Sequence, residues 1–146
     1  MKPHSLHALA TASLAALALC VTVAPSYAAD LTVNVKNLRS QNGKLMLALF
    51  NSADSFLKTD RQFGAQMIPA TQETGVFVFK NLPAGRYAVS VFHDENRNGK
   101  MDSNMLGIPV ERYGFSNNAA GKMGPPEFDA AAVAFSDSRE ITIDLR

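Results

Sequence analysis

The chain has 146 residues and is close to electrically neutral, with 14 basic and 13 acidic side chains and a formal net charge of +1. Its basic residues are dispersed and form no stripe that could neutralise a phosphate backbone, so the composition argues against a nucleic-acid partner. The length suits one domain built around one hydrophobic core.

An export signal is predicted at the N-terminus. Lys2 precedes an apolar stretch from Leu9 to Val23, and Ser26-Tyr27-Ala28 places small residues at the positions that a signal peptidase reads. We therefore expect residues 1–28 to be a signal peptide and residues 29–146 to form a single domain in the periplasm or outside the cell. The apolar stretch is shorter than the ~20 residues of a spanning helix, so no membrane span is expected once the signal is removed.

Loss of the signal peptide would restrict the available chemistry. It would take away Cys20, His4 and His7, which leaves His93 as the last imidazole and no cysteine at all. A disulfide, a cysteine nucleophile and a zinc site with two or three histidines are then excluded within one chain. A serine–histidine–aspartate site would have to use His93, and no serine is indicated beside it. This inventory favours a protein that is not an enzyme.

Alternation of apolar and polar residues dominates the rest of the chain. Residues 31–35 alternate cleanly, which is typical of a strand with one face in water. Residues 45–50 are apolar on both faces and therefore predict a central strand. The turn signal Gln41-Asn42-Gly43 lies between these runs, so they are predicted to pair as a hairpin.

Further strands and two helical turns are predicted beyond residue 50. Ser52 is a candidate cap for a helical turn that carries Phe56 and Leu57 back onto the sheet. An alanine-containing segment, residues 127–135, favours a second turn. Strand character recurs in residues 67–68, 76–79, 86–92 and 141–145. Because no long helical period is present, the pattern predicts an all-β fold, an antiparallel sandwich with one or two short helical turns.

A candidate calcium loop follows the strand at residues 86–92. Oxygen-bearing side chains occupy loop positions 1, 3, 5 and 9, and glycine occupies position 6. A cation would be held by the side chains of Asp94, Asn96, Asn98 and Asp102 and by the backbone carbonyl of Lys100. Position 12 is Met105 instead of a bidentate glutamate, so we expect weak binding, with a Kd on the order of 10⁻⁴ to 10⁻³ M. Glu111, Asp129 or a carbonyl from residues 104–118 would complete the shell.

The same residues also suit a loop without a metal. Asn98-Gly99 is a tight-turn signal, and Asp94 and Asn96 can cap backbone amides in Asx-turns. Both interpretations of the loop remain open on the sequence. His93 is in phase with the apolar face of the preceding strand and is interpreted as structural.

Polar and aromatic residues also gather in the long connection after the loop. Tyr113, Phe115 and Asn117-Asn118 form this cluster. Loop aromatics of this kind either bind a sugar or peptide or pack the connection against the sheet.

Two runs of the chain carry a family resemblance. Leu82-Pro83-Ala84-Gly85-Arg86-Tyr87 resembles the corner of transthyretin-like and carboxypeptidase-regulatory-like β-sandwiches. The residues from His93 to Asp102, Leu106 to Pro109 and Tyr113 to Asn118 resemble the bacterial family called domain of unknown function 2141. Arg97 stands where that family would have glycine. The resemblance covers the chain after residue 28 and implies an exported Ig-like domain; it implies no activity.

These observations lead to one expected function and two alternatives. We expect an exported β-sandwich that serves as a binding or accessory module, with residues 94–118 as its working surface and a protein, peptide or carbohydrate as ligand. The first alternative is a hydrolase that uses the carboxylates of Asp94, Asp102 and Glu111. The second is a structural protein of the cell envelope, which an exposed edge strand would favour.

Overall fold

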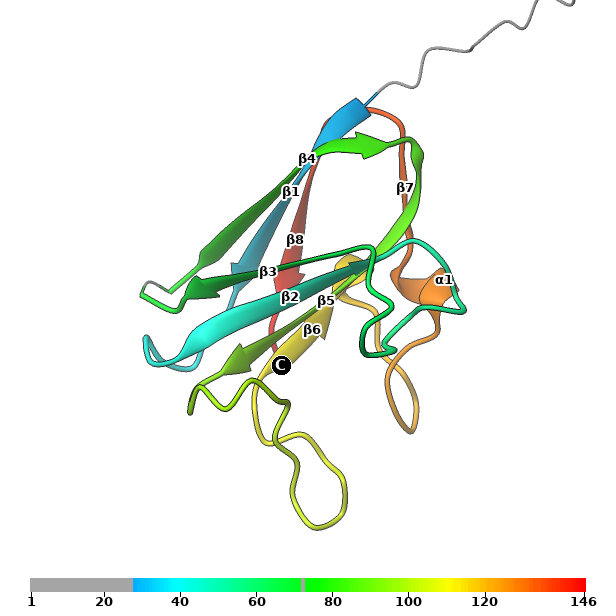
Figure 1. Cartoon of the computed structure of the whole chain (residues 1–146). Coiled ribbons are helices and arrows are strands. Elements are labelled where there is room, and N and C mark those ends of the chain that lie inside the picture. Colours follow the sequence, from blue (N-terminus) through cyan, green and yellow to red (C-terminus); the bar gives the residue numbers. More distant parts are fainter. Residues whose placement is uncertain (1–27, 72) are drawn as a thin grey trace, which may run out of the picture.

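Two β-sheets pack face to face in a computed structural model of the chain, which describes residues 28–71 and 73–146 (Figure 1). The predicted signal peptide lies outside the described residues, apart from Ala28. Within the described part, no helix is long and apolar enough to cross a membrane. Strands make up most of the regular structure, and the helical segments are single turns. The prediction of an all-β sandwich with short helical turns is therefore confirmed.

The smaller sheet has three strands in the order β4-β1-β8. Their bounds are β1 (Ala28–Lys36), β4 (Gly75–Pro83) and β8 (Arg139–Asp144). The alternation of β1 turns every second residue inward, so Leu31, Val33 and Val35 are at most 2% exposed. β1 pairs antiparallel with β4 but parallel with β8, which departs from the purely antiparallel arrangement that the sequence predicted.

The larger sheet runs in the order β3-β2-β5-β6, and β7 pairs with the first residues of β5. Its strands are β2 (Lys44–Phe50), β3 (Gly64–Pro69), β5 (Gly85–Asp94), β6 (Tyr113–Phe115) and β7 (Val133–Phe135). All of these pairs are antiparallel. β2 lies between β3 and β5, as predicted from its two apolar faces.

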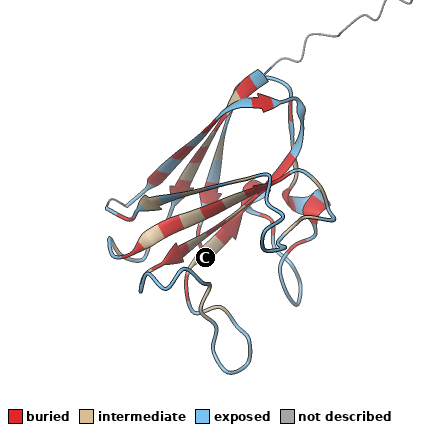
Figure 2. Ribbon diagram, viewed as in Figure 1, coloured by how far each residue is buried: buried red, intermediate tan, exposed pale blue. Residues whose placement is uncertain are grey.

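The main core fills the space between the two sheets, where buried residues line the strands of both (Figure 2). A second apolar cluster covers the opposite face of the larger sheet. There Phe56 lies with its ring centroid 5.4 Å from that of Phe50 and 5.8 Å from that of Phe128. Phe128 belongs to the single-turn helix α1 (Phe128–Ala131), and the second single turn is η1 (Ser116–Asn118). This second cluster explains why β2 is apolar on both faces.

Both predicted helical turns occupy their expected places. The segment 127–135 contains α1. After β2, the N–H of Phe56 donates to the carbonyl of Ser52 over 3.1 Å, which closes a turn. Phe56 packs onto the sheet as predicted, whereas Leu57 points outward and is 38% exposed.

The predicted hairpin between the first two strands is wrong. β1 lies in the smaller sheet and β2 in the larger one, so residues 37–43 carry the chain from one sheet to the other (Figure 1). The turn signal at 41–43 is local and does not specify which strands pair. Instead of pairing, β1 and β2 pack their inward faces against each other across the core.

The chain also crosses between the sheets at the predicted corner. β4 ends at Pro83 in one sheet and β5 begins at Gly85 in the other. The buried Tyr87 hydroxyl donates a hydrogen bond of 2.8 Å to the carbonyl of Pro83. This tyrosine corner holds the crossing in place, and it leads β5 to the end of the molecule where the candidate loop begins.

Candidate functional site in the loop after β5

The loop that follows β5 starts against the connection between β1 and β2. Gly43 in that connection has a φ of +76°, and a Cβ atom there would lie 2.0 Å from the carbonyl oxygen of Asp94. No side chain fits in that space, and the positive φ also favours glycine. The absence of a side chain at Gly43 therefore lets the two segments pack backbone against backbone.

Asp94 is the buried centre of the loop. Its side chain is fully buried, with one carboxylate oxygen accepting the N–H of Asn98 over 3.0 Å and the other accepting the N–H of Gly99 over 2.9 Å. The ammonium of Lys44 lies 4.0 Å from the same carboxylate. These contacts compensate for the removal of a carboxylate from water.

Asn96, Asn98 and Asp102 complete a ring of polar groups around Asp94. The side-chain oxygen of Asn96 accepts the N–H of Asn98 over 3.0 Å, and that of Asn98 accepts the N–H of Lys100 over 2.8 Å. The amide groups of both asparagines donate to the carboxylate of Asp102, over 2.6 and 2.9 Å. The structure thus brings all four predicted side chains together, in the Asx-turn pattern of the alternative interpretation.

Glu111 ties the two ends of the loop together. It is 6% exposed, and its two carboxylate oxygens accept the N–H of Glu95 over 3.0 Å and that of Asp102 over 3.1 Å. Of the other residues considered for the shell, Asp129 lies elsewhere and pairs with Arg86 over 2.8 Å. Glu111 is therefore the one of these two side chains that reaches the loop.

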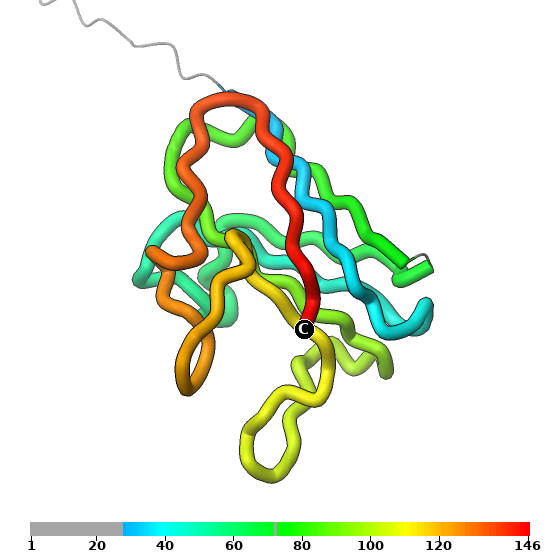
Figure 3. Tube along the Cα trace, turned by 180° about the vertical axis from the view of Figure 1, so that it is seen from behind, coloured from blue at the N-terminus to red at the C-terminus, as the bar shows by residue number. Residues whose placement is uncertain are grey.

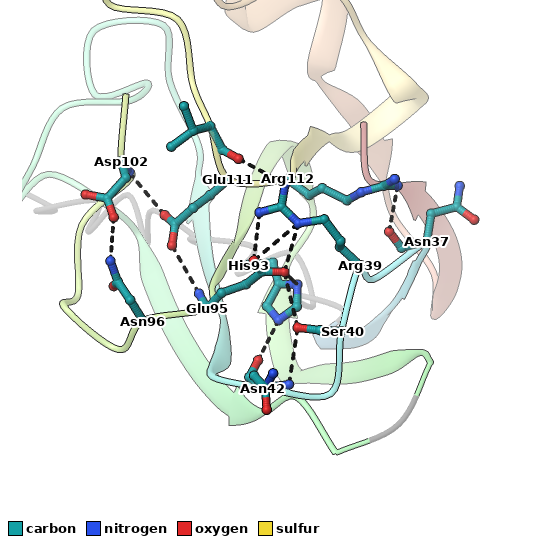
Figure 4. Close-up of polar contacts among 11 residues, drawn as sticks. Asn37, Arg39, Ser40, Asn42, His93, Glu95, Asn96, Asp102, Glu111 and Arg112 are labelled. Atoms are coloured by element: carbon teal, nitrogen blue, oxygen red, sulfur yellow. Dashed lines mark hydrogen bonds and ion pairs between the residues drawn. The ribbon is translucent and has the colours of Figure 1, made fainter. Parts of the chain in front are cut away.

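An ion pair fixes the loop to the connection that precedes β2 (Figure 4). The guanidinium of Arg39 contacts the carboxylate of Glu95 through two nitrogens, over 2.7 and 3.1 Å. Arg39 also donates to the carbonyl of Val110, and Ser40 donates to Glu95. The hydrogen bond from Arg39, together with its charge, lowers the pKa of Glu95, and the same contact raises the pKa of Arg39.

His93 is enclosed beneath this ion pair. The imidazole is fully buried, and its Nε2 lies 2.7 Å from the carbonyl oxygen of Asn42. A carbonyl only accepts, so Nε2 carries the proton. Nδ1 lies 3.5 Å from a carboxylate oxygen of Glu95 but has no hydrogen-bond partner among the described residues. A substrate cannot reach either nitrogen without displacement of the loop, which fits a structural role.

The donor set of the loop is made of oxygen atoms, as calcium requires. Within residues 28–71 and 73–146, no three histidine, cysteine, aspartate or glutamate side chains converge on one point to hold a metal. A cation at the loop would therefore rely on the carboxylates of Asp94 and Asp102 and on amide and carbonyl oxygens. The oxygen ligands of the loop therefore suit a hard cation, but only two of the side chains are negatively charged.

The later polar-aromatic cluster packs the connection down. Phe115 is 6% exposed and belongs to the second apolar cluster. The guanidinium of Arg146 lies over the ring of Tyr113 at 5.4 Å from its centroid. The amide of Asn117 donates to the carbonyl of Ala130 over 3.2 Å. These residues thus hold η1 and α1 against the larger sheet.

Sequence reasoning missed the contribution of the connection between β1 and β2. Arg39, Ser40 and Asn42 contact residues more than 50 positions further along the chain. No local spacing marks them as partners of the loop. Glu111 was recognised as a candidate because it lies close to the loop in the sequence.

Comparison with known proteins places the chain in a family without assigning it an activity. No characterised protein and no solved structure showed significant similarity to the chain. A family model with the description "Uncharacterized protein conserved in bacteria (DUF2141)" matches residues 33–143. This span runs from Val33 within β1 to Ile143 within β8 and includes the whole loop. The chain therefore belongs to the DUF2141 family of bacterial proteins.

Proposed function

We propose that this protein is an exported, non-enzymatic binding or accessory module that holds calcium weakly in the loop 94–102. The observation that carries the proposal is that one closed loop holds the oxygen-bearing side chains of Asp94, Asn96, Asn98 and Asp102 close together, linked by hydrogen bonds. Such a set, braced from outside by Glu111, keeps oxygen ligands close together before an ion arrives. Weak binding of this kind is what extracellular calcium modules use.

The contacts of the carboxylates favour a module over a hydrolase. Asp94 and Glu111 each accept two backbone N–H groups, and Asp102 accepts from two asparagine amides. A general acid or base needs an oxygen that can exchange a proton with a substrate. Two shallow depressions on the described surface lie beside β3 and between β7 and β8, and neither is lined by these carboxylates.

A bound cation would neutralise negative charge in the loop and would order its backbone. It would offset the repulsion between the carboxylates of Asp94 and Asp102 and hold both ends of the 94–102 segment. Because Met105 stands at position 12, no bidentate carboxylate from that position adds to the attraction, and the affinity stays low. Magnesium should bind less well, because it demands a tighter octahedral shell.

Thermal unfolding in calcium and in chelator tests this proposal. Calcium at about ten times its Kd should stabilise the fold by ~1.4 kcal/mol, because only the folded loop binds it. Asp102→Asn should abolish the response while keeping an oxygen at that position, and Asp94→Ala should abolish it too. Asp129→Asn, on an exposed carboxylate outside the loop, is the matched control and should respond like the unaltered protein. Identical melts with and without calcium would establish a self-capped turn instead.

Export is tested separately by cell fractionation. The protein should appear in the periplasm or the medium and begin at Ala29, because the small residues at 26 and 28 suit signal peptidase. N-terminal sequencing of the purified protein gives the answer directly. Recovery of chains that retain Met1 in the membrane fraction would overturn the export proposal.

A further inference from the structure

A hairpin of residues 103–110 projects from the end of the molecule opposite the start of β1 (Figures 1 and 3), and its apolar side chains are exposed to water. Its tip residues Met105 and Leu106 are 103% and 84% exposed, and Ile108 and Val110 are 56% and 47% exposed. The segment contains no charged residue. Single exposed apolar residues are common on protein surfaces, but four within six positions on one projection indicate a contact with something apolar.

The hairpin is ordered by its own hydrogen bonds. The N–H of Asn104 donates to the carbonyl of Ile108 over 2.8 Å, and the N–H of Val110 donates to that of Asp102 over 2.9 Å. The side-chain oxygen of Asn104 accepts the N–H groups of Leu106 and Ile108, over 2.9 and 3.1 Å. The tip is therefore a preformed wedge that presents its aliphatic side chains outward.

These hydrogen bonds favour a lipid surface over a groove on another protein. The N–H groups of residues 104, 106, 107, 108 and 110 have partners within residues 102–110 and Pro109 has no N–H, which leaves the N–H of Met105 without a hydrogen bond among the described residues. Lipid offers no partners for backbone groups, so a loop that enters it is favoured when most of these groups are paired internally. A groove on another protein can supply hydrogen-bond partners, so a loop that binds there does not need to pair its backbone N–H groups internally.

The surroundings of the hairpin agree with a lipid surface. The carboxylates on either side of the hairpin are engaged, with Glu111 accepting backbone N–H groups and Asp102 accepting asparagine amides, whereas Lys100 is exposed. The loop at residues 119–127 extends toward the same end in both views (Figures 1 and 3). Met123 in that loop is 102% exposed and follows the exposed Lys122. Aliphatic tips with flanking cations are typical of segments that lie in a membrane interface.

We propose that the hairpin 103–110 inserts its tip into the interface of a phospholipid bilayer and attaches the domain to that surface. The insertion is peripheral, because a hairpin of eight residues is far too short to span a bilayer. The proposal is independent of calcium, since it rests on the hairpin and not on the ligands of the loop.

A fluorescent reporter tests the insertion directly, because the chain contains no tryptophan. Leu106→Trp places the reporter at the tip, and Met67→Trp places it on the exposed side of β3, where Met67 is 60% exposed. Each protein is mixed with vesicles of phosphatidylethanolamine and phosphatidylglycerol in equal parts. The emission of Leu106→Trp should shift to the blue and be quenched by acyl chains that carry bromine, whereas that of Met67→Trp should not change.

A pair of double variants tests whether the hairpin drives the binding. Leu106→Gln with Ile108→Gln should lower the vesicle partition coefficient at least ~10-fold, because two aliphatic side chains leave the apolar phase. Met67→Gln with Val76→Gln removes exposed apolar groups from the sheets and should leave the coefficient unchanged. Absence of a shift on the vesicles, or an equal loss in both double variants, would overturn the proposal. Failure to bind vesicles would also be the result if the hairpin serves a protein groove.

Discussion

Glu111 should contribute more to stability than any exposed acidic residue of the chain. Both of its oxygens accept backbone N–H groups at the two ends of the loop, and the residue is 6% exposed. Glu111→Gln keeps one acceptor oxygen and turns an amide nitrogen toward the second N–H. One hydrogen bond to a charged group is lost and a buried donor is left without a partner. The free energy of unfolding should therefore fall by about 2–3 kcal/mol.

Urea unfolding measures this difference, with Glu73→Gln as the matched control. Glu73 is exposed, so its substitution should change the free energy of unfolding by no more than ~0.5 kcal/mol. Hydrogen exchange adds a local measurement, because the amides of Glu95 and Asp102 should exchange faster in Glu111→Gln than in the control. Equal unfolding midpoints for the two variants, or unchanged exchange at both amides, would refute the reasoning.

Three further predictions address the corner, the loop and the ion pair. Tyr87→Phe removes the hydrogen bond to Pro83 and should lower the unfolding free energy by about 1 kcal/mol in urea; a midpoint equal to that of the unaltered protein would contradict it. Arg97 has a φ of 63°, so Arg97→Gly should stabilise the fold by roughly 0.5–1 kcal/mol, and a lower melting temperature would count against this. Arg39 lowers the pKa of Glu95 in the folded protein below the ordinary value of 4.5. The ion pair therefore contributes its full stability at a pH above 4.5, and this contribution is lost as the pH falls through the lowered pKa of the folded state. The gap between the unaltered protein and Arg39→Gln should therefore shrink in acid, and a gap independent of pH would exclude this pair as its cause.

The sequence by itself determined the features that depend only on residues close together in the chain. The alternation at 31–35 and 141–145 sets the inward face of β1 and β8, because successive side chains of a strand point to opposite sides. The corner before Tyr87 and the polar loop after His93 were also predictable, since the hydrogen bonds at the corner and among residues 94–102 join residues at most six positions apart. Spacing alone specifies contacts of this kind.

Only the tertiary structure decided which strands pair and what holds the loop in place. A period of two defines the face of a strand but not its neighbour, so the sequence did not reveal that β1 and β2 belong to different sheets or that β1 and β8 run parallel. The ion pair between Arg39 and Glu95 joins residues 56 positions apart. It exists because the packing of Gly43 against Asp94 brings the two segments together. Hydrophobic burial is non-directional, and such long-range partners emerge only once the two sheets have packed.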